Sequence, residues 1–249
     1  DSENGSHNAA AVEEITLIDT VRYNGLEVGR KYSVTGTLVD KETGKALLDD
    51  AGKEITASNE FTAEKPNGTI EITFKFSGVS LAGKTTVAFE HMYTDGKEVA
   101  VHADLKDEKQ TEYFPSVHTT ATSNDTEDHV VGANEKVTIT DNVALKALKL
   151  GTEYTLSGIL MDAKTGKPIV IDGNTIIARR TFTADAHEMI VPLTYELNAS
   201  QLAGTTTVVF ENLYSSGSSS TSDLYVPLLT AIVGFFTDNS HFLMLVFGL

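Results

Sequence analysis

Cysteine and tryptophan are both absent from the 249 residues of this sequence. Without cysteine the chain cannot form disulfides, use a thiol nucleophile or build a cysteine-based zinc site. Basic residues are also few, because 19 lysines and arginines stand against 35 aspartates and glutamates, a formal net charge of −16. A chain this acidic repels phosphate backbones and anionic lipid headgroups, which argues against nucleic acid as a partner. If the protein works outside a cell, its stability must come from its core or from another covalent link.

Long apolar runs are missing except near the C-terminal end. The apolar stretch 224–236 has 13 residues, which is short of the ~20 residues that a membrane helix needs. No basic cluster and no LPxTG sorting signal follow it. We therefore expect membrane contact only if this tail is native, and a frame-shifted or mis-assembled end is an equally good interpretation. No signal peptide precedes the polar start at Asp1, so we expect a mature or excised piece.

The sequence repeats itself once. Residues 26–44, LEVGRKYSVTGTLVDKETG, match residues 148–166, LKLGTEYTLSGILMDAKTG. A period near 120 residues is too long for a solenoid unit and fits a whole domain that has been copied once. The matched acidic residues are Asp19 with Asp141 (141 − 19 = 122) and Glu90 with Glu211 (211 − 90 = 121).

Each copy shows the two-residue alternation of half-buried strands. Residues 69–76 place every second residue, all of them apolar, on one face, and residues 189–197 do the same. Pro192 lies on the opposite face of the second run, which predicts an edge strand. Turn-forming residues separate these runs, and no stretch shows helical periodicity. The pattern predicts an all-β fold of two tandem Ig-like β-sandwich domains.

The repeat also sets the expected boundaries. The first domain should cover residues 1–114 and the second residues 115–217. Residues 218–249 have no counterpart in the first copy, and we interpret them as a Ser-rich linker and a hydrophobic tail of doubtful origin.

A group of polar residues closes the first copy. His102, Asp104, Asp107 and Gln110 follow one another with the spacing H-x-D-x-x-D-x-x-Q-T, and we expect them on two short strands. Glu90 precedes them in a V-x-F-E strand. Without further context these side chains form a solvated polar face or, less often, a metal cluster.

Two more motifs make the pattern specific: an aspartate opening, D-T-V or D-N-V, and an L-x-x-G-x-x-Y-x-x-x-G-x-L hairpin. Over about residues 1–217 the chain resembles the VaFE-repeat, or Thr–Gln ester domain, family of Gram-positive adhesins, which is related to pilin-type Ig-like stalk domains. The resemblance implies that a threonine on the first strand attacks the carboxamide of a glutamine on the last strand. Ammonia leaves and an ester remains.

The resemblance also implies roles for individual residues. It makes Gln110 the acyl donor of the first copy, with His102 as a helper base. It makes Thr119 the nucleophile of the second copy, with Thr120 as an alternative because neighbouring strand residues face opposite ways. The assisting acids are Asp19 and Glu90 in the first copy and Asp141 and Glu211 in the second.

This set of residue types suits the reaction. A threonine hydroxyl is a weak nucleophile and needs a base beside it. An amide is a poor electrophile, and a carboxylic acid that burial keeps neutral can activate it. Holding both groups on adjacent strands supplies an effective concentration of roughly 10⁵ M or more.

Neither copy is complete. The position that matches Thr119 falls upstream of Asp1, and no H-x-D-x-x-D-x-x-Q follows Glu211. As it stands, neither domain can close its own ester. The second domain is predicted to lack its last strand, which leaves an open sheet edge.

The same residues also have ordinary interpretations. The strand glutamates can be exposed, the aspartates can cap turns and the threonines can be plain β-formers. The stretch 78–85 matches the P-loop pattern G-x-x-x-x-G-K-[ST], but β-like sequence follows it, which favours a turn.

The sequence therefore predicts a structural stalk module of a cell-wall-attached adhesin on a Gram-positive bacterium, cross-linked by autocatalytic Thr–Gln esters. We expect no enzyme turnover, no cofactor and no metal. Expected partners are neighbouring repeats of the same polypeptide and, through another domain, a host protein or glycan. Two alternatives stay open: a ligand-binding β-sandwich module without a cross-link, and a pilin-type domain with a Lys–Asn isopeptide.

Overall fold

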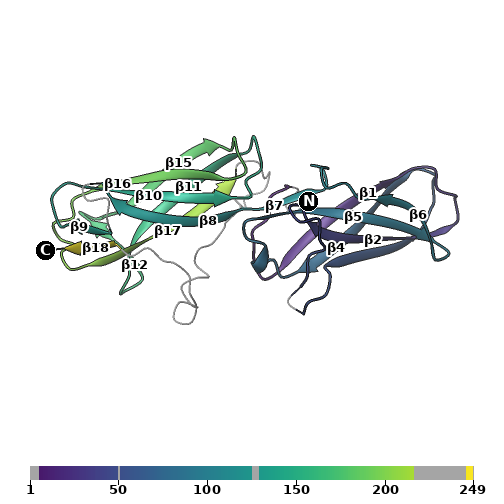
Figure 1. Ribbon diagram of the computed structural model, residues 1–249, viewed down its shortest axis with the longest axis horizontal. Helices are drawn as coiled ribbons and strands as arrows, with labels where there is room; N and C mark the ends of the chain where they lie inside the picture. The colour runs from purple at the N-terminus through teal and green to yellow at the C-terminus, as the bar shows by residue number, and fades with distance from the viewer. Residues whose placement is uncertain (1–5, 50, 125–128, 216–244, 249) are drawn as a thin grey trace. The chain divides into compact units, whose positions relative to one another are not determined.

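The structure is a computed structural model that describes residues 6–49, 51–124, 129–215 and 245–248. The chain divides into two compact units, one ending at Pro115 and the next beginning at Ser116. We call them unit 1 and unit 2 and describe each by itself (Figure 1). Most of the predicted linker and tail, residues 216–244 and 249, lies outside the described residues.

Unit 1 consists of two β-sheets. β1 pairs antiparallel with β4, and the second sheet has the order β3-β2-β5-β6, with β7 also pairing with β5. The strands are β1 (Ile15–Tyr23), β2 (Lys31–Asp40), β3 (Thr56–Thr62), β4 (Gly68–Phe76), β5 (Lys84–Thr94), β6 (Lys97–His102) and β7 (Thr111–Phe114).

Unit 2 repeats this plan and adds several strands, among them β8. One sheet has the order β16-β10-β8 and the other β12-β11-β17-β18-β9, with β15 pairing with β11 and a separate β13-β14 pair. The strands are β8 (Ser116–Ser123), β9 (Val130–Gly132), β10 (Val137–Lys146), β11 (Glu153–Asp162), β12 (Lys167–Pro168), β13 (Val170–Ile171), β14 (Asn174–Thr175), β15 (Ile177–Thr183), β16 (Met189–Leu197), β17 (Thr206–Ser215) and β18 (Leu245–Gly248).

The units differ at one sheet edge. β10 pairs with β16 on one side and with β8 on the other. β1 is the counterpart of β10, yet among the described residues it pairs only with β4. No strand of the described residues therefore covers, in unit 1, the edge that β8 covers in unit 2.

β18 takes the place of the last strand in unit 2. In unit 1, Thr85 of β5 pairs with Tyr113 of β7. At the 121-residue offset, Thr206 of β17 pairs with Val246 of β18, also antiparallel. The parallel bridge between Asn8 and Tyr113 is matched as well, because β9 runs parallel to β18. The expectation of an open edge there was wrong, since β18, a segment from the tail, pairs with β17.

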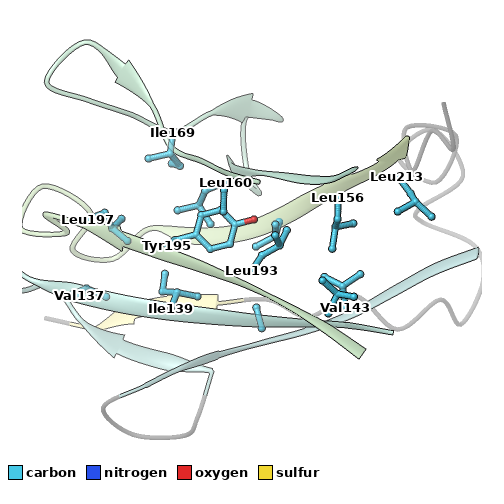
Figure 2. Packing of buried hydrophobic residues seen from close by; sticks show 14 of the residues in the cluster. Val137, Ile139, Val143, Leu156, Leu160, Ile169, Leu193, Tyr195, Leu197 and Leu213 are labelled. Carbon is cyan, nitrogen blue, oxygen red and sulfur yellow. The ribbon is translucent and has the colours of Figure 1, made fainter. Parts of the chain in front are cut away.

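Each unit closes around an apolar core between its two sheets. In unit 2 the inward residues of β10 and β16 meet those of β11 and β17 (Figure 2). The largest buried side chains there are Tyr154 and Tyr195, and in unit 1 they are Phe74 and Phe114. Burying an aromatic or aliphatic side chain contributes about 1.5–3 kcal/mol, so these residues hold the sheets face to face.

The strand predictions are confirmed. The runs at 69–76 and 189–197 form β4 and β16, and β16 is the edge strand that Pro192 predicts. The P-loop-like stretch is a turn with a short 3₁₀ segment, Val79–Leu81, that leads into β5. Across the residues that the structure describes, no helix has the length and apolar character needed to span a membrane.

Candidate functional site: the buried acid pairs and the strand-edge groove

Each unit buries an aspartate and a glutamate at matching inward positions of its strands. In unit 1, Asp19 lies in the middle of β1 and is 8% exposed, and Glu90 lies in the middle of β5 and is 3% exposed. Both occupy inward positions of their strands, where the neighbouring inward residues are mainly apolar. They neither cap turns nor face solvent, so the ordinary interpretations of these two residues are excluded.

Burial keeps Glu90 protonated. Loss of solvent, together with the nearby negative charge of Asp19, raises the pKa of Glu90 to about 9. Oδ2 of Asp19 and Oε1 of Glu90 are both buried without a hydrogen-bond partner. Two facing carboxyl groups in a low-dielectric site cannot both be charged at low cost, and a proton on one of them resolves this. Glu90 is therefore a neutral acid at neutral pH.

His102 connects this acid pair to the loop before β7. Its Nδ1 lies 3.1 Å from Oε2 of Glu90, and its Nε2 lies 3.2 Å from Oδ2 of Asp107. The imidazole is about half exposed and sits at the end of β6, opposite Glu90 in the strand pairing. These contacts fix the orientation of the ring and direct it toward the glutamate rather than toward Asp19.

A groove runs along the open edge of β1 and contains these groups. It has a volume of about 490 Å³. Gln110, which directly precedes β7 and is half-buried, lines it as well. The lining residues are Ile18, Asp19, Thr20, Val21, Arg22, Glu90, His102, Asp107, Lys109 and Gln110. The predicted acyl donor, helper base and both acids of unit 1 thus meet in one open groove.

Unit 2 holds a threonine where unit 1 has the groove. The hydroxyl of Thr119 on β8 donates a hydrogen bond to Oδ1 of Asp141 on β10. Asp141 and Glu211 are fully buried, and burial together with Asp141 raises the pKa of Glu211 to about 10. Thr119 is half-buried, whereas Thr120 is exposed on the other face of β8. A threonine hydroxyl that donates to a buried carboxylate is arranged as a nucleophile with its proton acceptor.

A model of one protein family matches the chain twice. It describes a T-Q ester bond containing domain and matches residues 1–113 and 115–227. The chain belongs to this family. The first match covers Asp19, Glu90 and the groove, and the second covers Asp141, Glu211 and Thr119, so the two units are tandem T-Q domains. No curated protein matches the chain significantly.

Solved structures show only distant likeness to these T-Q domains. A bacterial adhesin from Mobiluncus mulieris, described as containing intramolecular disulfide, isopeptide and ester bond cross-links, is 15% identical at a TM-score of 0.37, covering 83% of this chain and 76% of the other. The C-terminal domain of the Streptococcus agalactiae AgI/II polypeptide BspA is 12% identical at a TM-score of 0.38, covering 90% of this chain and 95% of the other. The C-terminal domain of the Streptococcus pyogenes antigen I/II-family protein AspA is 9% identical at a TM-score of 0.41, covering 88% of this chain and 92% of the other. Scores this low carry no further argument.

The loop of the first T-Q domain differs in part from expectation. Of the polar residues predicted on two short strands, only His102 lies in a strand. Asp104 and Asp107 lie in the turns between β6 and β7, where their side chains accept hydrogen bonds from Lys106 and Lys109 backbone amides. Turn formation explains these aspartates, and Asp107 additionally holds His102. Among the described residues, no cluster of His, Asp and Glu is arranged to bind a metal ion.

Sequence reasoning missed Tyr195 in the second T-Q domain. Its hydroxyl is buried between the sheets without a hydrogen-bond partner (Figure 2). Burial raises the pKa of Tyr195, and the charges of Asp141 and Glu211 raise it further, which places the phenol beside the acid pair. The matching residue of the first domain is Phe74, so the only available signal was one aromatic exchanged for another across the repeat.

Proposed function

We propose that this chain is a structural stalk module of a bacterial cell-surface adhesin whose T-Q domains are stabilised by autocatalytic Thr–Gln ester cross-links. One observation carries the proposal. The same buried Asp–Glu pair lies beside a threonine in unit 2 and beside a glutamine and a histidine in unit 1. The two units together present every group that the reaction requires, at matching positions of one fold.

The geometry suggests a role for each group. The aspartate accepts the proton of the threonine hydroxyl, as Asp141 accepts the hydrogen bond of Thr119. The threonine oxygen then adds to the side-chain carbonyl carbon of the glutamine. Neutral Glu90 donates to the amide as charge develops, and His102 with Asp107 holds Glu90 in place. The carbon–nitrogen bond breaks, ammonia leaves with the transferred proton, and the ester is closed without any redox change.

The roles differ from the sequence prediction in one respect. The resemblance gave His102 the part of helper base. Its two ring nitrogens contact Glu90 and Asp107, and Asp19 occupies the position that meets the hydroxyl in unit 2. We therefore infer that the aspartate is the base and that His102 acts through Glu90.

The proposed ester also suggests where the protein works. An ester between first and last strands constrains the unfolded chain as a disulfide does, which suits a cysteine-free protein under mechanical load. We propose the cell wall of a Gram-positive bacterium as its location, with neighbouring repeats as direct partners and a host protein or glycan bound through another domain. The reactive residues are used once, so the module is no enzyme.

The isopeptide alternative has less support. A Lys–Asn cross-link needs a lysine desolvated in the core. No lysine is buried among the residues that the structure describes. Lys41 is half-buried, and its amine donates hydrogen bonds to Glu108 and Thr111. The buried acid pair and the groove with Gln110 instead favour the ester.

The test supplies unit 1 with a strand like β8. A copy of residues 115–122 is added directly before Asp1, which keeps the 122-residue offset of the repeat and supplies a threonine to β1. We expect the intact mass in denaturant to fall short of the sequence mass by one ammonia. The missing mass should map to a peptide that joins Gln110 to the added threonine.

Gln110→Ala is the matched control and should retain the full sequence mass. A full sequence mass in the grafted chain, with unit 1 shown to be folded, would overturn the ester function. The ligand-binding module without a cross-link would then be the better interpretation.

A further inference from the structure

The segment between β6 and β7 carries Asp107 and Gln110 and consists of turns. The backbone amide of Gln110 donates to the carbonyl oxygen of Asp107 at 3.2 Å, which closes the turn of residues 107–110. A turn has fewer backbone hydrogen bonds than a strand, so its position depends more on side-chain contacts. The place of Gln110 beside the acid pair therefore depends on what holds this turn.

Lys41, which directly follows β2, holds the turn through its amine. Its Nζ lies 2.6 Å from Oε1 of Glu108 and 3.0 Å from Oγ1 of Thr111. An ammonium group can only donate, so the hydroxyl of Thr111 accepts from Lys41 and gives its own proton to the carbonyl oxygen of Asp107, 2.7 Å away. Lys41 thus contacts the chain on both sides of Gln110.

The acceptors of Lys41 are themselves anchored in unit 1. Oε2 of Glu108 accepts a hydrogen bond of 2.6 Å from the hydroxyl of Tyr113, which is 2% exposed on β7. Thr111, at the start of β7, is fully buried. The lysine, the turn and β7 therefore form one connected hydrogen-bond network.

Unit 2 has the turn that carries Lys41, but without the lysine. Oδ1 of Asp40 accepts two backbone amides from the residues that follow it, and Asp162 does the same at the 122-residue offset. The next residue is Lys41 in unit 1 and Ala163 in unit 2, and in both its backbone amide donates to the neighbouring strand or its start. This turn does not need a lysine. Within the described residues, the cation occurs in the unit that also has the glutamine turn.

We propose that Lys41 is a positioning residue for ester formation, which holds the turn of residues 107–110 so that Gln110 stays beside the acid pair and Asp107 stays on His102. This inference rests on the proposed function. Lys41 is not among the residues that line the groove, so it acts through Glu108 and Thr111 and exchanges no proton with the reacting groups.

The expected effect is on the reaction more than on stability. The Glu108 side chain is 65% exposed, and ion pairs with an exposed partner contribute little to folding. A reacting group displaced by about 1 Å, in contrast, can lose about 100-fold in rate. Removal of the Lys41 amine should therefore leave unit 1 folded and slow the ester.

The first measurement is the rate of ammonia loss in the grafted chain. Lys41→Ala, which introduces the residue that unit 2 has in the same turn, should slow ester formation by about 10-fold or more. Lys41→Arg should restore most of the rate, because a guanidinium can donate to Glu108 and Thr111 together. This rescue separates positioning from a general loss of packing.

Lys31→Ala is the matched control. It removes the same charge at the other end of β2, where Lys31 pairs with Glu60 at 2.6 Å, far along the strand from the glutamine turn. The ester rate should stay unchanged.

Hydrogen exchange in the chain without the graft gives a second readout that needs no ester. In Lys41→Ala the backbone amide of Gln110 should lose protection, because the turn that it closes is no longer held. The backbone amide at position 41, which donates to the carbonyl of Thr85, should keep its protection.

The outcomes distinguish this inference from the proposed function. If Lys41→Ala closes the ester at the parent rate, or Lys31→Ala slows it equally, the positioning role is wrong and the proposed function stands. If the grafted parent is folded and forms no ester, the proposed function is wrong. The exchange of the Gln110 amide then decides alone: lost protection in Lys41→Ala supports the hold on the turn, and unchanged protection rejects it.

Discussion

The two units bury an acid pair at the same two strand positions, yet the side chains around the pairs differ. The pair is Asp19 with Glu90 in unit 1 and Asp141 with Glu211 in unit 2. Unit 1 surrounds its pair with His102 and Gln110, and no strand of its described residues covers the neighbouring edge of β1. Unit 2 covers that edge with β8 and supplies Thr119. The pair is common to both units, and the reactive groups are not.

This difference separates what the fold holds from what the reaction consumes. A buried acid pair costs stability unless one member is neutral and the other is hydrogen-bonded. Both units nevertheless bury it, and Glu90 and Glu211 both have a strongly raised pKa. The threonine and glutamine lie on or beside the terminal strands, β8 and β7, outside the central part of each sandwich. The acid pair is therefore built into the fold, while the chemistry depends on which terminal strands are present.

The largest expected effect comes from removing the acid in only one unit. In the chain with the grafted strand, Glu90→Gln should slow ester formation by at least about 100-fold, because general acid catalysis contributes 10²–10⁴-fold. The amide of glutamine keeps the shape of Glu90 but cannot give up a proton. The rate is measured as the fraction of chains lacking one ammonia at successive times after refolding.

Glu211→Gln is the matched control in the same grafted chain. It makes the same substitution at the equivalent position of unit 2, where no glutamine of the described residues meets Thr119. We expect the unit 1 rate to stay unchanged. Equal slowing by both variants would show that the substitution acts on folding rather than on the reaction.

The next effect is the dependence of unit 2 stability on pH. The pKa of Glu211 is about 10 in the folded unit against an ordinary value of 4.5. Below pH 4.5 the group is protonated in both states, and its full contribution to stability is present. As the pH rises toward 10, only the unfolded chain loses the proton. The free energy of unfolding should therefore fall by up to about 1.4 kcal/mol per pH unit in this window.

Hydrogen exchange at pH 5, 7 and 9, resolved by unit, measures this slope. Glu211→Gln should flatten the pH dependence of unit 2 and leave that of unit 1, which follows Glu90, as it was. A slope in unit 2 that is the same with and without Glu211 would assign the effect to other groups.

The architecture was predictable because the strand alternation occurs twice. Two copies of one pattern predict the all-β sandwich units, and Pro192 predicts an edge strand. The repeat also identified the acid pairs. Their burial was less certain, because in an alternating strand either Glu90 or Phe89 can face inward, and the sheet partner decides which. The structure gives Glu90 the inward position and leaves Phe89 half-buried.

Other features depend on contacts that no local pattern encodes. β18 has no counterpart in the first copy, and its pairing with β17 joins residues about 40 positions apart in sequence. Of the two loop aspartates, Asp107 reaches His102 because of the turn geometry, and the spacing alone did not separate it from Asp104. Tyr195 was missed because it preserves the aromatic pattern that Phe74 sets.

The smallest expected effect concerns this last difference between the units. The hydroxyl of Tyr195 lies over Gly158, where an added Cβ would be 2.0 Å from the oxygen, and it has no hydrogen-bond partner. A buried polar group left unpaired costs roughly 1–3 kcal/mol. Tyr195→Phe restores the arrangement of unit 1, so we expect it to stabilise unit 2 by about 1 kcal/mol, measured by hydrogen exchange at pH 5.

The reciprocal change, Phe74→Tyr, should destabilise unit 1 by a similar amount. The new hydroxyl would lie near Gly36, where an added Cβ already meets the Phe74 ring at 2.6 Å. A loss of stability in Tyr195→Phe would contradict the expectation and favour a hydrogen bond from the phenol to Asp141 or Glu211. In that case Tyr195 would be a hydrogen-bond donor beside the acid pair of unit 2. Its role there would resemble that of His102 beside the acid pair of unit 1, although the described residues of unit 2 hold no histidine at that position.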